Sequence, residues 1–181
     1  MSQLKVNSII PVGGVPSGGG GGIIQVKQTI KTDTFSSTSS GTHDITGLSV
    51  SITPKLSTSK ILVLCDLCGH VHNGMGGAFQ MKRTISSTST TIGLADAAGS
   101  RSRSSFSGTL YTGDGGGANF IILNANTRIL DSPNTTSAIT YQAQMVQIST
   151  SLYVVNRSEF DTDNNDYTRA VSNITVMEVS A

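Results

Sequence analysis

The sequence predicts an all-β protein, an antiparallel, jelly-roll-like β-sandwich preceded by an extended N-terminal arm and a glycine joint. Apolar residues nowhere recur at helical spacing over three turns without an interrupting Gly, Pro or Ser/Thr cluster. Short stretches of alternating apolar and polar residues, in contrast, follow one another along most of the chain. The run Gly18–Gly22 separates these stretches from a short N-terminal segment.

Residues 1–17 are the predicted arm and residues 18–22 the joint, because consecutive glycines lose much backbone entropy on folding. A joint of this length spans on the order of 12 Å. So short an arm cannot build its own core, and we expect its apolar residues to be buried on a partner. These partner-binding residues are Leu4, Val6, Ile9 and Ile10. Residues 23–181 then form one β-sandwich domain.

The polar residues of the chain are mostly hydroxyls rather than ions. Charged residues make up 13% of the chain, about half the usual share of roughly 25%, while Ser and Thr together number 48. The net charge is +1 without a basic stripe, which argues against nucleic acid as a partner. Apolar runs of four or five residues are too short for membrane insertion, and the N-terminus lacks a signal-peptide pattern. We therefore expect a soluble protein made in a reducing cytoplasm.

Two stretches carry the clearest strand patterns. In residues 24–31, one predicted buried face contains Ile24, Val26, Gln28 and Ile30. Residues 44–53 repeat the alternation with a phase shift at Gly47, which predicts a β-bulge. Residues 60–72 are the most apolar and are predicted to lie at the centre of a sheet. Further strands are predicted over residues 78–85, 90–94, 101–111, 119–130, 139–149, 152–155 and 170–179.

The stretch containing Cys65, Cys68, His70 and His72 is the strongest candidate for a metal site. Residues three apart in a strand point to opposite faces, so Cys65 and Cys68 cannot reach one ion. We predict ordinary strand packing here, with neither a metal nor a cofactor. His70 and His72 do share a face, and together with Met75 they are candidates for the axis or tip of a symmetric assembly.

The acidic stretch of residues 161–166 resembles the start of a calcium loop, with oxygen-bearing side chains at alternate positions. Asp166 and Ser172 stand where such a loop has glycine and glutamate, so we predict a turn instead. We also find no nucleophile elbow and no phosphate-binding Gly-Lys-Ser/Thr motif after the glycine run. The sequence therefore predicts no enzyme.

Several segments resemble, in their order, a family of small virion proteins of tailed bacteriophages, particularly cyanophages. Residues 4–11 look like the attachment arm of that family and are followed, as in the family, by a glycine joint. The other matching segments, which together cover most of the chain, are residues 24–36, 45–54, 59–63, 92–101, 130–141 and 174–179. The resemblance implies a fibre, tip or decoration module located in the virion, usually homotrimeric.

Three functions follow as hypotheses. The first is a homotrimeric tail-fibre or tip module, attached to other virion proteins through its arm and contacting a host surface glycan or protein. The second is a capsid decoration protein that stabilises the shell. The third is a carbohydrate-binding jelly-roll module, with stacking faces supplied by Tyr111, Tyr141, Tyr153 and Tyr167. We favour core or interface positions for these tyrosines.

Overall fold

The computed structural model describes residues 22–71, 77–108, 121–147 and 150–180, which form eleven β-strands joined by turns and loops. All pairings between these strands are antiparallel. The all-β prediction is therefore confirmed. The strands are β1 (Ile23–Lys31), β2 (Phe35–Ser37), β3 (Gly41–Ile52), β4 (Lys60–Val71), β5 (Gly77–Ile85), β6 (Thr88–Ile92), β7 (Phe106–Gly108), β8 (Leu123–Asp131), β9 (Ile139–Gln147), β10 (Tyr153–Val155) and β11 (Ser172–Val179).

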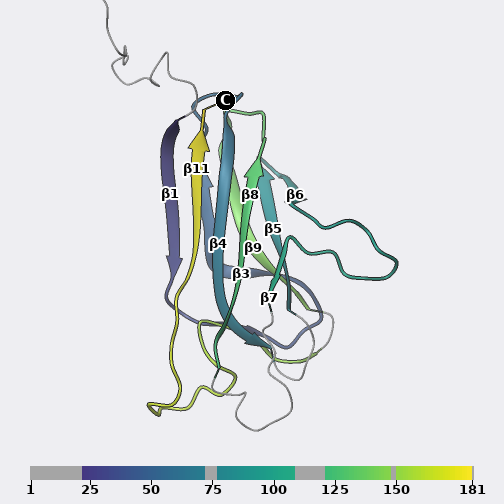
Figure 1. Cartoon of the computed structure of the whole chain (residues 1–181), viewed down its shortest axis with the longest axis vertical. Helices are drawn as coiled ribbons and strands as arrows, with labels where there is room; N and C mark the ends of the chain where they lie inside the picture. The colour runs from purple at the N-terminus through teal and green to yellow at the C-terminus, as the bar shows by residue number, and fades with distance from the viewer. Residues whose placement is uncertain (1–21, 72–76, 109–120, 148–149, 181) are drawn as a thin grey trace, which may run out of the picture.

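The strands form two sheets that face each other as a sandwich (Figure 1). The front sheet has the order β1-β11-β4-β10-β2, and β8 pairs with the opposite side of β4. The back sheet has the order β3-β9-β5-β6, and β7 also pairs with β5. Strand β4 is thus the centre of the front sheet, as its apolar sequence predicts.

Successive long strands cross between the sheets. The chain passes from β3 in the back sheet to β4 in the front sheet and returns in β5, and it repeats this exchange through β8, β9 and β11. Such crossings are typical of Greek-key sandwiches. They also bring distant segments together, because β1 pairs with β11 over eight residue pairs.

One hydrophobic core fills the space between the sheets. Leu48, Ile61, Phe79 and Val176, each from a different strand, are fully buried in it. Full burial of a large apolar side chain contributes roughly 1.5–3 kcal/mol, so the inward faces of the two sheets supply most of the stabilising energy.

A buried polar cluster joins the two sheets next to this core. Arg83 of β5 donates to both carboxylate oxygens of Asp131 of β8, at 2.8 and 3.0 Å. The Tyr141 hydroxyl of β9 donates to the same carboxylate at 2.8 Å. Burial and this hydrogen bond raise the pKa of Tyr141, which keeps the phenol protonated as a donor. The cluster fixes β8 against the back sheet.

The predicted bulge in β3 is confirmed. The register with β9 shifts between Asp44 and Ser49, and Gly47 lies inside this interval with a φ of 82°, which glycine adopts without strain. The shift keeps apolar side chains on the core side before and after the bulge, because Ile45 and Leu48 are both fully buried.

The predicted buried face of β1 is wrong. Val26 and Ile30 are 51% and 56% exposed, whereas Lys31 is only 2% exposed. The register aligns Val26 with Met177 and Lys27 with the buried Val176. The side of β1 that carries Val26 and Ile30 therefore lies on the outer face of the front sheet. Periodicity separates two faces of a strand but does not say which one the core covers.

Two polar residues on the core side of β1, Gln25 and Lys31, have partners there. The Lys31 ammonium lies 2.9 Å from a carboxylate oxygen of Asp33. The Gln25 amide donates to the buried Glu178 at 2.6 Å. Glu178 also accepts backbone N–H groups of Lys55 and Leu56, at 2.7 and 3.3 Å. Burial alone would raise the pKa of Glu178, but these hydrogen bonds outweigh it, and the pKa is lowered.

Two further predictions need correction. The strand predicted over residues 101–111 begins only at Phe106, because residues before it bond to the Ala95 backbone instead of continuing the ladder with β5. Residues 109–111 lie outside the described residues. The Ser105 N–H donates to the Phe79 carbonyl at 2.8 Å, and its hydroxyl donates to the Ile92 carbonyl at 2.6 Å. The strand β2 was not predicted, because three residues are too few to show an alternation.

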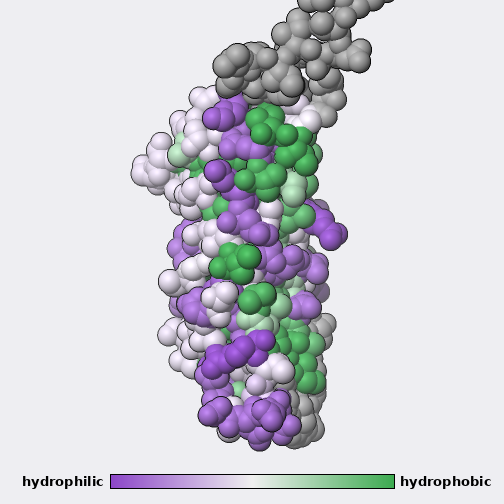
Figure 2. Space-filling model, turned by 90° about the vertical axis from the view of Figure 1, so that its left-hand side faces the viewer, coloured by the Kyte–Doolittle hydropathy of each residue, from purple (hydrophilic) through white to green (hydrophobic). Residues whose placement is uncertain are grey.

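The sandwich has two distinct ends. At one end, Gly22 and Ser180 exchange hydrogen bonds of 2.9 and 3.0 Å, so the described chain starts and finishes at the same place. The loop of residues 156–171, which we call the distal loop, connects β10 to β11 at the opposite end (Figure 1). A view onto the β1 side shows hydrophobic patches along the body and hydrophilic residues at the distal end (Figure 2).

Candidate functional site: the distal loop

The base of the distal loop is held by Asn156. Its N–H donates to the Cys68 carbonyl at 2.9 Å, and its own carbonyl accepts the N–H of Ala170 at 3.1 Å. The next residue, Arg157, forms an isolated antiparallel bridge with Arg169. The two ends of the loop are therefore fastened together, and the residues between them form a closed projection.

The side chain of Asn156 is fully buried and satisfies three further groups. The amide donates to the carbonyls of Lys31 and Asp33, at 2.8 and 2.9 Å, and its oxygen accepts the Ser172 hydroxyl at 2.6 Å. Asn156 adopts a φ of 63°, a left-handed conformation that Asn tolerates better than most residues. Sequence reasoning missed this residue, although an Asn directly after a strand is a recognised turn signal.

His70 is the one candidate axis or tip residue that the structure describes. It lies near the distal end of β4, is 3% exposed, and places its Nε2 3.5 Å from a carboxylate oxygen of Glu159. The pair links the central strand of the front sheet to the distal loop. His70 therefore acts here as a buried contact of the loop, and its assignment to an axis or tip stays a prediction.

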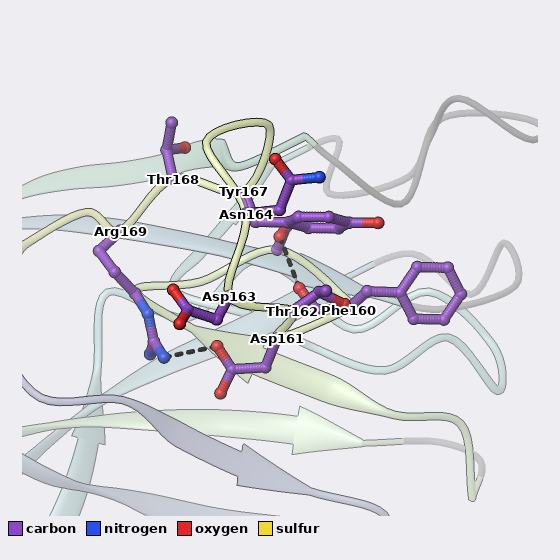
Figure 3. A pocket seen from close by; sticks show the side chains of 9 residues that line it. Phe160, Asp161, Thr162, Asp163, Asn164, Tyr167, Thr168 and Arg169 are labelled. Carbon is purple, nitrogen blue, oxygen red and sulfur yellow. Dashed lines mark hydrogen bonds and ion pairs between the residues drawn. The ribbon is translucent and has the colours of Figure 1, made fainter.

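The distal loop contains a pocket of about 320 Å³ (Figure 3). Asp161 and Arg169 form an ion pair of 2.5 Å on one side of it, while the Phe160 ring points away from this pair. Phe160 is 47% exposed, and Tyr167 is half-buried. The lining thus combines carboxylates, an amide, a guanidinium and two aromatic rings.

The calcium interpretation gains no support from this geometry. The Asp161 carboxylate, which would be the first ligand, already pairs with Arg169. The Asp166 N–H donates to the Asn164 side chain at 3.3 Å, a contact typical of an Asx turn. Within the described ranges, no three His, Cys, Asp or Glu side chains gather as metal ligands.

Cys65 and Cys68 lie on opposite faces of β4, as strand geometry predicts. Cys65 is fully buried in the core, and burial raises the pKa of its thiol to about 12. Cys68 is half-buried on the outer face, where its thiol donates to Asn124 at 3.0 Å. The two sulfurs therefore cannot bind one ion, and neither forms a disulfide.

Two of the four tyrosines are core residues. Tyr141 and Tyr153 are fully buried and offer no stacking face to a sugar. Tyr167 lines the distal pocket, and Tyr111 lies outside the described residues. Also outside the described residues are the predicted partner-binding residues Leu4, Val6, Ile9 and Ile10 and the predicted axis or tip residues His72 and Met75.

We compared the chain with protein-family models, curated proteins and solved structures. No protein-family model and no curated protein matches the chain. Among solved structures, a chain from the structure of infectious bursal disease virus, Gx strain, is similar at 12% identity and a TM-score of 0.33. The match covers 87% of this chain and 40% of the viral chain, so this chain spans less than half of it. This TM-score is too low for the likeness to bear on function. The described residues contain no helix long and apolar enough to cross a membrane.

Proposed function

We propose that the chain is a non-enzymatic structural protein of a bacteriophage virion. The observation that carries this proposal is the ordered resemblance of its segments to small phage virion proteins. The β-sandwich agrees with the fold expected from that resemblance. Within this class, we favour a homotrimeric tail-fibre or tip-like module that is anchored through its N-terminal arm.

The layout of the sandwich is compatible with this tip-like arrangement. The described chain begins at Gly22, at the end where Ser180 closes the front sheet. An arm leaving from this end would hold the body so that the distal loop points away from the virion. The pocket with Phe160, Tyr167 and Asp161 would then meet the host surface, where a glycan or protein is the expected partner.

The placement can be tested with gold-labelled antibody against residues 23–181 on intact phage particles, viewed by electron microscopy. We expect label at the tail or at the fibre ends. Label spread over the capsid would replace the tip proposal by the decoration alternative, and heat and osmotic tolerance of particles lacking the protein would then be measured. Particles without any label would refute the virion proposal itself.

A further inference from the structure

The outer face of the front sheet carries a continuous row of apolar side chains across four strands. The register aligns Val26 of β1 with Met177 of β11, Met177 with Leu62 of β4, and Leu62 with Leu130 of β8. We call these four residues the apolar row. Val26 and Leu130 are 51% and 56% exposed, and the two residues between them are half-buried. The row therefore reaches from one side of this sheet to the other.

Further apolar residues border the row on the same face. Ile30 follows Val26 four positions later along β1 and is 56% exposed, and Leu64 lies two positions after Leu62 on β4. Ile23 aligns with Val179 at the Gly22 end of the sheet and is 61% exposed. Four of the eight exposed large hydrophobic residues of the described chain thus lie on one sheet face. An apolar patch of this kind on a protein surface is often a contact site.

The outer face of the back sheet is polar at matching positions. Ser51 and Thr140 pair through their hydroxyls at 2.8 Å, as do Thr84 and Ser89 at 2.9 Å. Lys82 on this face bonds to Asp44 at 2.6 and 2.7 Å. Covering this face would strip water from many polar groups, whereas covering the apolar row would not. The two faces therefore differ in the surroundings that they suit.

We propose that the apolar row and its neighbours form the contact surface between copies of this chain. The inference deepens the proposed function and rests on it in one respect, since a virion subunit meets its own copies at high local concentration. The partner surface is the same front sheet of another copy, which presents the same apolar side chains. Such a contact is two-fold, so it joins copies that belong to different trimers and is distinct from the three-fold contacts inside the proposed trimer. The distal loop and its pocket take no part in this contact.

Charge favours a copy of the chain over a strongly charged partner. The face carries both signs, with Lys60 and Arg128 as exposed cations and Asp66 as an exposed anion. Lys60 and Asp66 lie six residues apart on β4, or about 20 Å, with uncharged residues between them. A second copy whose β4 runs in the opposite direction brings its Asp66 toward Lys60. A nucleic acid or an anionic membrane would find no such complement.

The size of the face sets the expected strength. Four strands about 4.8 Å apart and about 23 Å of strand length give a flat area of about 440 Å² for each copy. A pair then buries roughly 900 Å², below the ~1,200–2,000 Å² of standard stable interfaces. We therefore expect concentration-dependent association in solution, which becomes stronger where other virion proteins hold the copies side by side.

The test is sedimentation velocity of the purified full-length chain over a range of concentrations. The variant Leu130→Glu places a carboxylate in the apolar row at an exposed position, so the fold should tolerate it. The matched control is Ser51→Glu, which places the same group on the outer face of the back sheet. We expect wild type and Ser51→Glu to associate with rising concentration and Leu130→Glu to associate at least tenfold more weakly. Thermal melting by circular dichroism confirms that both variants are folded.

A chain lacking residues 1–17 tests the N-terminal arm as the alternative occupant of this face. Association of this shortened chain at wild-type strength supports the contact between sheet faces. Loss of its association, while Leu130→Glu still associates, would assign the contact to the arm and overturn the inference. A monomeric wild type at all concentrations, or equal association of Leu130→Glu and Ser51→Glu, would also overturn it. None of these outcomes depends on where antibody labels the particle, so the inference and the proposed function can fail separately.

Discussion

The outer faces of the two sheets carry different kinds of residue. On the back sheet, hydroxyls and amides cover the face and bond to one another, as Ser51 and Thr140 do. On the front sheet, the apolar row crosses the face from Val26 to Leu130. The fraction of charged residues, 13% of the whole chain, does not distinguish the two faces. Composition therefore indicates which residue types are available for the surface. The register of the strands determines on which face the polar and the apolar residues lie.

The polar groups of the two sheets differ in the same sense. The outer face of the back sheet exposes its polar groups to water, whereas Asn156 and Glu178, beside and within the front sheet, are buried and each is satisfied by several hydrogen bonds. An exposed hydrogen bond exchanges readily with water, so its loss costs little, while an unpaired buried group costs about 1–3 kcal/mol. Removing a polar group from each sheet in turn should therefore lower the free energy of unfolding by different amounts.

The largest effect is expected for Asn156→Ala. The change leaves the carbonyls of Lys31 and Asp33 and the Ser172 hydroxyl without their buried partner, and it places Ala at a φ of 63°. We expect the free energy of unfolding to fall by at least about 3 kcal/mol in urea titrations. The control Ser51→Ala, on the exposed face of the back sheet, should stay within about 0.5 kcal/mol of wild type. Equal losses in the two variants would contradict the distinction between buried and exposed polar groups.

A smaller effect, dependent on pH, is expected at Glu178. Its folded-state pKa is lowered, so the ionised carboxylate stabilises the fold above the unfolded pKa and this contribution is lost as pH falls through the folded pKa. Wild-type stability should therefore decline below about pH 5, and Glu178→Gln should be less stable at pH 7 with a flatter acid profile.

Asp44→Asn is the matched variant on the back sheet. Burial opposes ionisation of Asp44, but hydrogen bonds from Lys82 and Gln144 prevail and lower its pKa. Its side chain is 49% exposed, so solvent weakens the pair with Lys82, and we expect a smaller change in the acid profile. Urea unfolding between pH 3 and pH 7 gives the free energy of unfolding of both variants as a function of pH. A larger change in the acid profile for Asp44→Asn than for Glu178→Gln would contradict the prediction that the buried carboxylate contributes more to stability.

The smallest effect concerns the two thiols of β4, one on each face of the front sheet. The pKa of Cys65 is raised to about 12 by burial, so its thiolate is scarce and inaccessible at neutral pH. We expect iodoacetamide to modify Cys68 slowly and Cys65 not at all in the native protein, with both modified in urea, as read by mass spectrometry. Equal native modification of the two residues would show that the core opens at β4.

Residues with strong local signals were predictable from the sequence. Gly47 gave away the bulge because a phase shift in an alternating stretch needs an extra residue, and the apolar run of β4 indicated a central strand. The face of β1 was not predictable in this way, because its core-facing Lys31 is tolerated through a partner, Asp33, that alternation does not reveal. Asn156 was missed for the same reason, since its role depends on carbonyls that are distant in the sequence.

In the candidate site, too, features with local sequence signals were predictable and contacts between distant residues were not. The turn-forming character of residues 161–166 was readable from its Asx content, and the opposed faces of Cys65 and Cys68 followed from strand geometry. The pairing of His70 with Glu159 was not, because it joins a strand to a loop that follows about ninety residues later in the chain. Contacts of this kind depend on the strand order, which a single sequence does not specify.

The opposite placement of Gly22 and the distal loop has a mechanical consequence. A force applied between an anchored arm and a partner held at the distal loop would run parallel to the strands. The hydrogen bonds between β1 and β11 are perpendicular to that direction, so the eight residue pairs would be loaded together in shear rather than opened one at a time. The first and last strands of the described chain would thus form a mechanical clamp that resists extension along the strand direction.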